Sequence, residues 1–157
     1  MKTLLIGLGN PILTDDGAGV LAARVVREAL PPGSGIDVIE AAVGGIALME
    51  AMIGYQRVLL IDALWAPERA AGEVIVFDAG ALPGTLNMAS THDADLPTAL
   101  RVGRALAADL PTDEHIQIIA ITAQDVLTFS EQPTPQVAAA IPRAAAAALA
   151  LLGHPQA

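Results

Sequence analysis

The sequence contains no cysteine and has few aromatic or basic residues. Without thiols the chain forms no disulfides and has no cysteine nucleophile, and any metal site must be built from oxygen and imidazole ligands. One Trp, one Tyr and two Phe leave little surface on which nucleobases could stack. Eight Lys and Arg against 17 Asp and Glu give a net charge of −9, which argues against a nucleic-acid partner because phosphates attract basic side chains.

Long apolar runs are also missing, although 54% of the residues are hydrophobic and the mean hydropathy is +0.54. No uninterrupted apolar stretch reaches the roughly 20 residues that a transmembrane helix needs. The residues before the first glycine-rich loop are too few for a signal peptide. We therefore expect a cytoplasmic, monomeric protein without membrane contact. A length of 157 residues predicts one domain, 1–157, with a sizeable core.

Short apolar segments of strand length alternate with segments of helical periodicity. Strands are expected at 3–6, 36–40, 57–61, 73–77 and 115–121, and helices at 20–30, 46–53, 96–108 and from about residue 136 onward. The run 57–61 is continuously apolar, which is typical of a strand buried on both faces, whereas 73–77 suggests an edge strand. The alternation predicts an α/β fold: a three-layer sandwich with a twisted, mostly parallel sheet of about five strands flanked by helices.

A glycine-rich loop with two adjacent acids follows the first expected strand, and it reads Gly7-Leu8-Gly9-Asn10-Pro11-Ile12-Leu13-Thr14-Asp15-Asp16-Gly17-Ala18-Gly19. Ile12 replaces the third glycine of a dinucleotide fingerprint, and the Gly-Lys-Ser/Thr of a Walker loop is missing. Asp15 and Asp16 would repel a phosphate and favour a metal cation or another positive group. Alternatively, one of these two acids only caps the next helix.

Three side chains that can bind a metal are expected at one edge of this sheet, because ligands of open α/β sheets bind beyond the carboxyl ends of the strands. Asp16 lies in the loop after the first strand, Asp62 is predicted to end the strand 57–61, and His92 lies in the long loop 79–95. Two carboxylates and one imidazole suit zinc, nickel or iron in an open site. Each residue also has an ordinary interpretation, since strand-end acids accept backbone hydrogen bonds and most lone histidines are surface groups.

Other hydrolase motifs are missing from the sequence. None of Ser34, Ser90 and Ser130 lies in a Gly-x-Ser-x-Gly elbow, and no His-Glu-x-x-His pattern occurs. The three metal-binding candidates therefore remain the strongest signal of chemistry.

Four segments of the chain resemble the hydrogenase maturation proteases, the endopeptidases that process the large subunit of nickel–iron hydrogenases. The opening loop 7–19 is similar to the N-terminal signature of that family. Similar segments follow in the family's order: Leu60-Ile61-Asp62-Ala63, Ser90-Thr91-His92-Asp93 and Phe129-Ser130-Glu131. The resemblance extends over nearly the whole chain.

This resemblance implies that Asp16, Asp62 and His92 are the catalytic and metal-recognising residues. The implied partner is a nickel–iron hydrogenase large-subunit precursor, and the implied reaction removes its C-terminal extension after nickel insertion. The cofactor, nickel, is then supplied by the substrate. If a general base is needed, Asp16 is the preferred one, with Asp15 orienting the loop.

The segment after the last expected strand departs from the family pattern. Many members carry a glycine and a proline where this chain has Ala120-Ile121-Thr122-Ala123-Gln124, a segment expected to shape the substrate groove. Two other functions would use the same ligand set. One is a non-catalytic, metal-sensing chaperone for the precursor, and the other is a metal-dependent hydrolase of small molecules with loop 79–95 as a lid.

Overall fold

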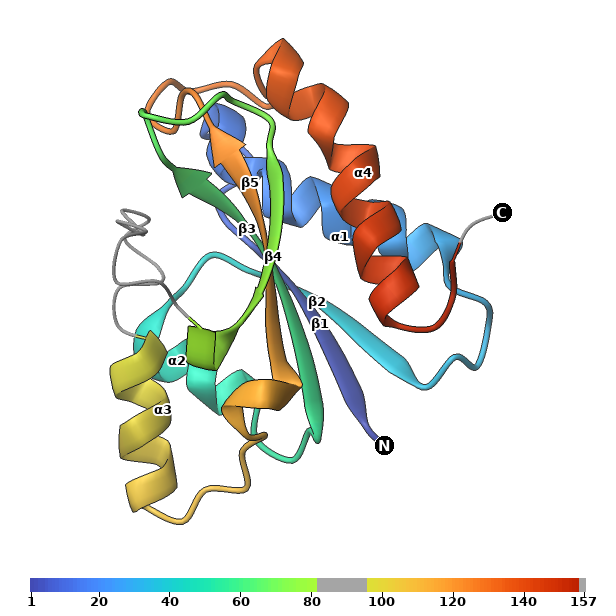
Figure 1. Cartoon of the computed structure of the whole chain (residues 1–157), viewed down its shortest axis with the longest axis vertical. Coiled ribbons are helices and arrows are strands. Elements are labelled where there is room, and N and C mark those ends of the chain that lie inside the picture. Colours follow the sequence, from blue (N-terminus) through green and yellow to red (C-terminus); the bar gives the residue numbers. More distant parts are fainter. Residues whose placement is uncertain (82–95, 156–157) are drawn as a thin grey trace.

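A five-stranded sheet lies between two layers of helices in the computed structural model, which describes residues 1–81 and 96–155 (Figure 1). In chain order the elements are β1 (Thr3–Leu8), the 3-10 turn η1 (Thr14–Gly17), α1 (Ala18–Ala29), β2 (Ile36–Ala41), α2 (Gly45–Ala51), β3 (Arg57–Trp65), β4 (Val74–Asp78), the 3-10 turn η2 (Ala79–Ala81), α3 (Leu96–Ala105), the 3-10 turn η3 (Asp113–His115), β5 (Ile116–Ala123) and α4 (Pro135–Leu151). The predicted three-layer α/β sandwich is confirmed. None of the described helices combines the length and apolar composition that a membrane span requires.

The strands are ordered β2-β1-β3-β5-β4 across the sheet. The pairs β1–β2, β1–β3 and β3–β5 are parallel, and only β4 runs antiparallel, at the edge beside β5. The expectations of a mostly parallel sheet and of an edge strand near 73–77 are therefore confirmed. The parallel arrangement brings the carboxyl ends of β1, β3 and β5 to the same side of the molecule.

The two largest apolar cores of the described residues lie on opposite faces of the sheet. Leu59, Ile61 and Ala63 of β3 pack with residues of α1 and α4. Val58 and Leu60, which alternate with them, pack with residues of α2 and α3 on the opposite face. Figure 1 shows these two helix pairs on either side of the sheet. The central strand is thus buried on both faces, as its continuous apolar run predicted.

β3 is longer than the sequence indicated, and the prediction that Asp62 ends this strand is wrong. Pairing with β5 continues from Asp62 opposite Ala120 to Trp65 opposite Ala123. The strand continues because the residues after the acid, Ala63 and Leu64, are also buried apolar side chains. Pairing with β1, in contrast, stops at Ile61. Asp62 is therefore the first β3 residue beyond the β1 ladder.

Close packing of α1 on the sheet depends on glycines of the opening loop. A Cβ atom at Gly19 would overlap the backbone carbonyl oxygens of Ile61 and Leu8. A Cβ atom at Gly7 would lie 2.6 Å from the Cβ of Ala23. The missing side chains let the first turns of α1 approach both β1 and β3, which fixes the position of the preceding acidic turn.

Replacing Gly19 with alanine should lower the free energy of unfolding by about 1–3 kcal/mol, because the added methyl group overpacks the contact between α1 and the sheet. Denaturant unfolding followed by circular dichroism measures the effect. Gly80→Ala is the control, since its Cβ would meet its nearest neighbour, the Cβ of Asp113, at 3.3 Å. Equal stability of the two variants would contradict the packing argument.

Glu40 on β2 connects this strand to α1 through two ion pairs. Its carboxylate lies 2.8 Å from Arg24 Nη2 and 2.9 Å from Arg27 Nη1. The hydrogen bond from Arg24, supported by Arg27, lowers the pKa of Glu40 from its ordinary 4.5 to about 2. Because the pKa of Glu40 is depressed in the folded state, its ion pairs with the two arginines stabilise the fold above pH 4.5. This stabilisation is lost as the pH falls towards 2.

The stability difference between the wild type and Glu40→Gln should therefore shrink as the pH falls from 4.5 to 2. Both arginine side chains are nearly half exposed, so the difference at neutral pH should not exceed about 1 kcal/mol. Urea unfolding of both proteins at several pH values measures it. A difference that does not change over this range would show that the ion pairs do not stabilise the fold.

Candidate functional site

The carboxyl edge of the sheet brings together two of the three predicted metal-binding residues. Asp16 lies in η1, after the end of β1, and Asp62 lies on the neighbouring strand β3 just past the β1 ladder. The turn η1 packs against β3. Both acids are buried, with 7% and 2% of their surface exposed. Most acids of a folded protein are exposed. Two buried acids at the edge where α/β sheets bind ligands are therefore typical of a functional site.

The turn that carries Asp16 closes around its own carboxylate. Oδ2 accepts a 2.8 Å hydrogen bond from the backbone N–H of Asn10. Gly9 makes this closure possible, because its φ of 128° favours glycine and a Cβ there would overlap the carbonyl group of Asp16. Oδ1 accepts no hydrogen bond from the described residues. The geometry thus holds one carboxylate oxygen in place and leaves the second for a ligand or a water molecule.

Asp62 lies on the face of β3 that packs towards α2 and α3, because its side chain alternates with those of Ile61 and Ala63. Its Oδ1 accepts a 2.8 Å hydrogen bond from the backbone N–H of Ala63. The side chain thus does accept a backbone hydrogen bond, as its ordinary interpretation predicted. This bond involves one oxygen and fixes the orientation of the carboxylate.

The third predicted ligand, His92, lies outside the described residues. Within residues 1–81 and 96–155, no group of three or more His, Asp or Glu side chains is arranged to hold a metal ion. Asp16 and Asp62 supply two carboxylates. A cation held by them would need further ligands, either from other residues of the chain or from the molecule that carries the cation.

Asp15 has a different role from its neighbour. Its fully buried carboxylate accepts hydrogen bonds from the backbone N–H groups of Gln124, Asp125 and Thr134, at 2.9, 2.9 and 2.7 Å. The Thr134 hydroxyl donates to it as well, at 3.0 Å. Neither acid caps α1, whose N-cap is Gly17 without a side-chain hydrogen bond. The expectation that Asp15 orients the opening loop is confirmed.

The segment that Asp15 binds, loop 124–134, is also attached to the opening loop through its backbone. The N–H of Thr14 donates to the carbonyl of Ser130, and the N–H of Ser130 donates to the carbonyl of Ile12, at 2.9 and 3.0 Å. Within the loop, the Asp125 carboxylate accepts bonds from Leu127 and Thr128, and these bonds, chiefly from Thr128, hold the pKa of Asp125 below its usual value. Two loops far apart in sequence therefore form one hydrogen-bonded unit.

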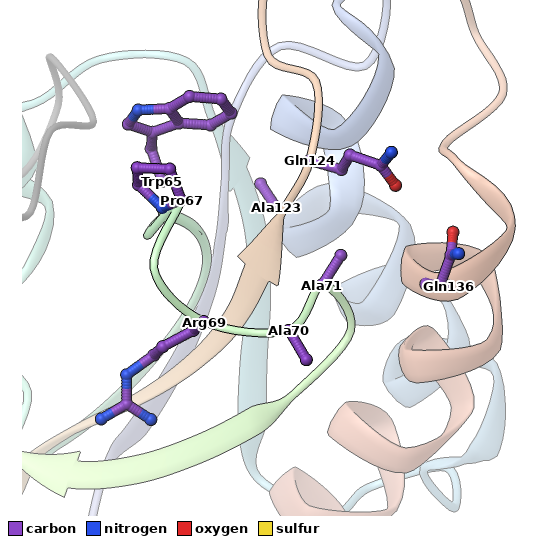
Figure 2. A pocket seen from close by; sticks show the side chains of 8 residues that line it. All are labelled: Trp65, Pro67, Arg69, Ala70, Ala71, Ala123, Gln124 and Gln136. Atoms are coloured by element: carbon purple, nitrogen blue, oxygen red, sulfur yellow. The ribbon is translucent and has the colours of Figure 1, made fainter.

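A cavity of about 500 Å³ opens next to this unit, at the ends of β3 and β5 (Figure 2). Its lining residues are Trp65, Pro67, Arg69, Ala70, Ala71, Ala123, Gln124 and Gln136. In Figure 2, Trp65 and Pro67 lie on one side and the carboxamides of Gln124 and Gln136 on the other. Neither carboxamide has a hydrogen-bond partner in the part of the chain that the structure describes. They can pair with the N–H and C=O groups of a peptide.

The sequence indicated only one side of this cavity. The segment 120–124, which was expected to shape a substrate groove, contributes Ala123 and Gln124. The other lining residues come from the end of β3, the connection to β4 and the first turn of α4. No local pattern links these segments, so only the fold assembles them.

Replacing Asp15 with asparagine should lower the free energy of unfolding by about 2–4 kcal/mol, because the new NH2 group would face backbone N–H donors in a buried site. Denaturant unfolding measures the loss. Asp16→Asn is the matched control and should cost about 1 kcal/mol or less, since Asp16 accepts one hydrogen bond from the described residues. Equal losses in the two variants would show that Asp15 does not hold the loops together.

Comparison with known proteins begins with a family match. Residues 21–151 match the family model described as hydrogenase maturation protease. The matched range includes Asp62 and His92 and begins after Asp16. A curated relative, the hydrogenase 2 maturation protease of Escherichia coli strain K12, is 25% identical over 105 residues. These residues make up 64% of this chain and 64% of the relative, so the match spans slightly less than two thirds of the relative's length.

Solved structures agree over nearly the whole chain. The [NiFe] hydrogenase maturation protease HybD from Thermococcus kodakarensis is 26% identical, with a TM-score of 0.74 and coverage of 97% of this chain and 99% of that one. The hydrogenase maturating endopeptidase HybD from E. coli has a TM-score of 0.81 at 24% identity, covering 98% of this chain and 93% of the other, and supports the fold. With a family match over most of its length, this chain belongs to the hydrogenase maturation protease family.

Proposed function

We propose that this protein is an endopeptidase that removes the C-terminal extension of a nickel–iron hydrogenase large-subunit precursor after nickel insertion. The observation that carries the proposal is the placement of Asp16 and Asp62 at the carboxyl edge of the sheet in a chain of this family. The names of the relatives refer to hydrogenase maturation, which supports a hydrogenase precursor as the substrate.

In this proposal, Asp16, Asp62 and His92 recognise the nickel that the precursor already carries. A site without thiolates is a modest nickel site, because soft ligands or several imidazoles usually strengthen binding of this metal. The precursor supplies the remaining ligands from its own metal centre. Cleavage then depends on nickel insertion, because a precursor without the ion lacks the group that the two acids and the histidine bind.

Hydrolysis of the peptide bond requires a water molecule activated close to the scissile carbonyl. Asp16 is the proposed general base, because its Oδ1 accepts no hydrogen bond from the described residues and its Oδ2 is fixed by Asn10. The substrate's nickel offers a second route, in which it polarises the carbonyl or lowers the pKa of a bound water. In both routes, water adds to the carbonyl carbon, the C–N bond breaks and the leaving amine takes up a proton.

The variants Asp16→Asn, Asp62→Asn and His92→Ala should each process nickel-loaded precursor at least about 100-fold more slowly than the wild type. Mass spectrometry of the precursor's C-terminus measures the cleaved fraction over time. Asp109→Asn, an exposed acid after α3, is the control and should keep wild-type activity. Nickel-free precursor should stay uncut by all of these proteins.

Normal processing by all three site variants would refute the site assignment. A wild-type protein that binds the precursor but leaves its mass unchanged would instead favour the metal-sensing chaperone. Cleavage of small amides or esters in the absence of any protein would favour the small-molecule hydrolase.

A further inference from the structure

Two large apolar side chains project from loop 124–134 into solvent. Leu127 is 83% exposed and Phe129 is 79% exposed, which places both among the most exposed large apolar side chains of the described residues. We call these two residues the apolar tip. Ile12, which is 46% exposed, lies beside it, because its carbonyl accepts the hydrogen bond from Ser130. Exposed apolar side chains that gather at one place often mark a protein-binding surface.

The backbone that carries the apolar tip is held in place before any partner binds. Asp15 binds the two ends of the loop, at Gln124–Asp125 and at Thr134. The Asp125 carboxylate fixes the turn at Leu127 and Thr128. Because this backbone is already ordered, little conformational entropy is lost when the tip enters an interface. A loop with exposed Leu and Phe and a fixed backbone is suited to binding. Its Val126 packs against the apolar core, whereas Leu127 and Phe129 belong to none of the core clusters of the described residues.

The charged side chains within loop 124–134 are both acidic. The sequence has no Lys or Arg between residues 105 and 142, whereas Asp125 and Glu131 lie within the loop. A partner that covers the tip is therefore expected to present an apolar patch bordered by basic side chains.

The tip is also directly connected to the candidate site. Thr14 and Asp15, the residues immediately before Asp16, hydrogen-bond to Ser130 and Asp125 of the loop. Gln124 at the start of the loop and Gln136 in the first turn of α4, just after the loop, both line the cavity in Figure 2. A protein seated on the tip would therefore reach both the cavity and the acidic turn.

We propose that Leu127 and Phe129 form the docking surface for the substrate precursor, contacting an apolar patch bordered by basic side chains on that protein. The proposal rests on the proposed function and assigns it a binding element separate from the reacting groups. The tip provides affinity for the folded precursor, and Asp16 and Asp62 act on the segment that this docking brings to them. The tip therefore controls KM and leaves kcat to the site.

The double variant Leu127→Ser/Phe129→Ser tests the proposal. For the binding measurement, the wild-type tip and the double variant each carry Asp16→Asn, so that the precursor is not cleaved. The dissociation constant for nickel-loaded precursor, measured by isothermal titration calorimetry, should be at least tenfold higher for the double variant. In the wild-type background, KM should rise by a similar factor and kcat should stay within twofold. The melting temperature should not change, because both side chains are exposed.

Leu106→Ser is the matched control. Leu106 is also 77% exposed, but it directly follows α3. Figure 1 shows α3 at the end of the molecule opposite the connection between β5 and α4. Its replacement should change neither the dissociation constant nor KM.

Binding of the precursor to the wild-type tip should also weaken as the salt concentration rises, because salt screens the acidic border. Affinity that does not depend on salt would refute the assignment of a basic border to the partner.

The outcomes separate this proposal from the function on which it rests. If the wild type cuts the precursor and the double variant binds it as tightly, the docking assignment fails and the proposed function stands. If the wild type neither binds nor cuts the precursor, both fail. Sedimentation of the free proteins adds one further outcome: a dimer that the double variant converts to monomers would show that the tip joins two copies of this chain, which also overturns the assignment.

Discussion

The hydrogen bonds to the buried carboxylate of Asp15 are the interaction on which the rest of this site depends. A buried charge is costly unless donors surround it, and Asp15 has three backbone N–H groups and one hydroxyl. These donors belong to the first two residues after β5 and to Thr134, the residue before α4. One side chain therefore joins the first turn of the chain to segments 109 to 119 residues away.

The sheet provides the second constraint on the site, because β1 and β5 pair with β3 up to different residues. β1 stops its pairing with β3 at Ile61, whereas β5 pairs with β3 as far as Trp65. The acidic turn lies where β1 has ended, against the part of β3 that carries Asp62. Glycines 7 and 19 let α1 pack closely enough to keep the turn there. The difference in strand length thus creates the position at which two carboxylates share one edge.

These constraints also separate two tasks within one rigid unit. Asp15 and Asp16 are adjacent, yet one is fully used in holding loops together and the other keeps an oxygen without a hydrogen bond from the described residues. Loop 124–134, fixed by Asp15, carries exposed Leu127 and Phe129 at a set distance from Asp16. Under the proposed function, the same hydrogen-bonded frame therefore positions both the acids that would meet the substrate's metal centre and the apolar side chains that would meet its surface.

The sequence by itself determined the alternation of strands and helices, the central and edge strands and the acidic glycine loop, because periodicity and glycine content report local conformation and burial. Tertiary structure decided the rest. Asp62 looked like a strand end, since the apolar run stops there, but pairing with β5 extends the strand to Trp65. The partners of Asp15 and the residues lining the cavity were not predictable, because they come from segments that no local pattern connects. Strand register and hydrogen bonds across more than 100 residues arise only when the whole sheet is assembled.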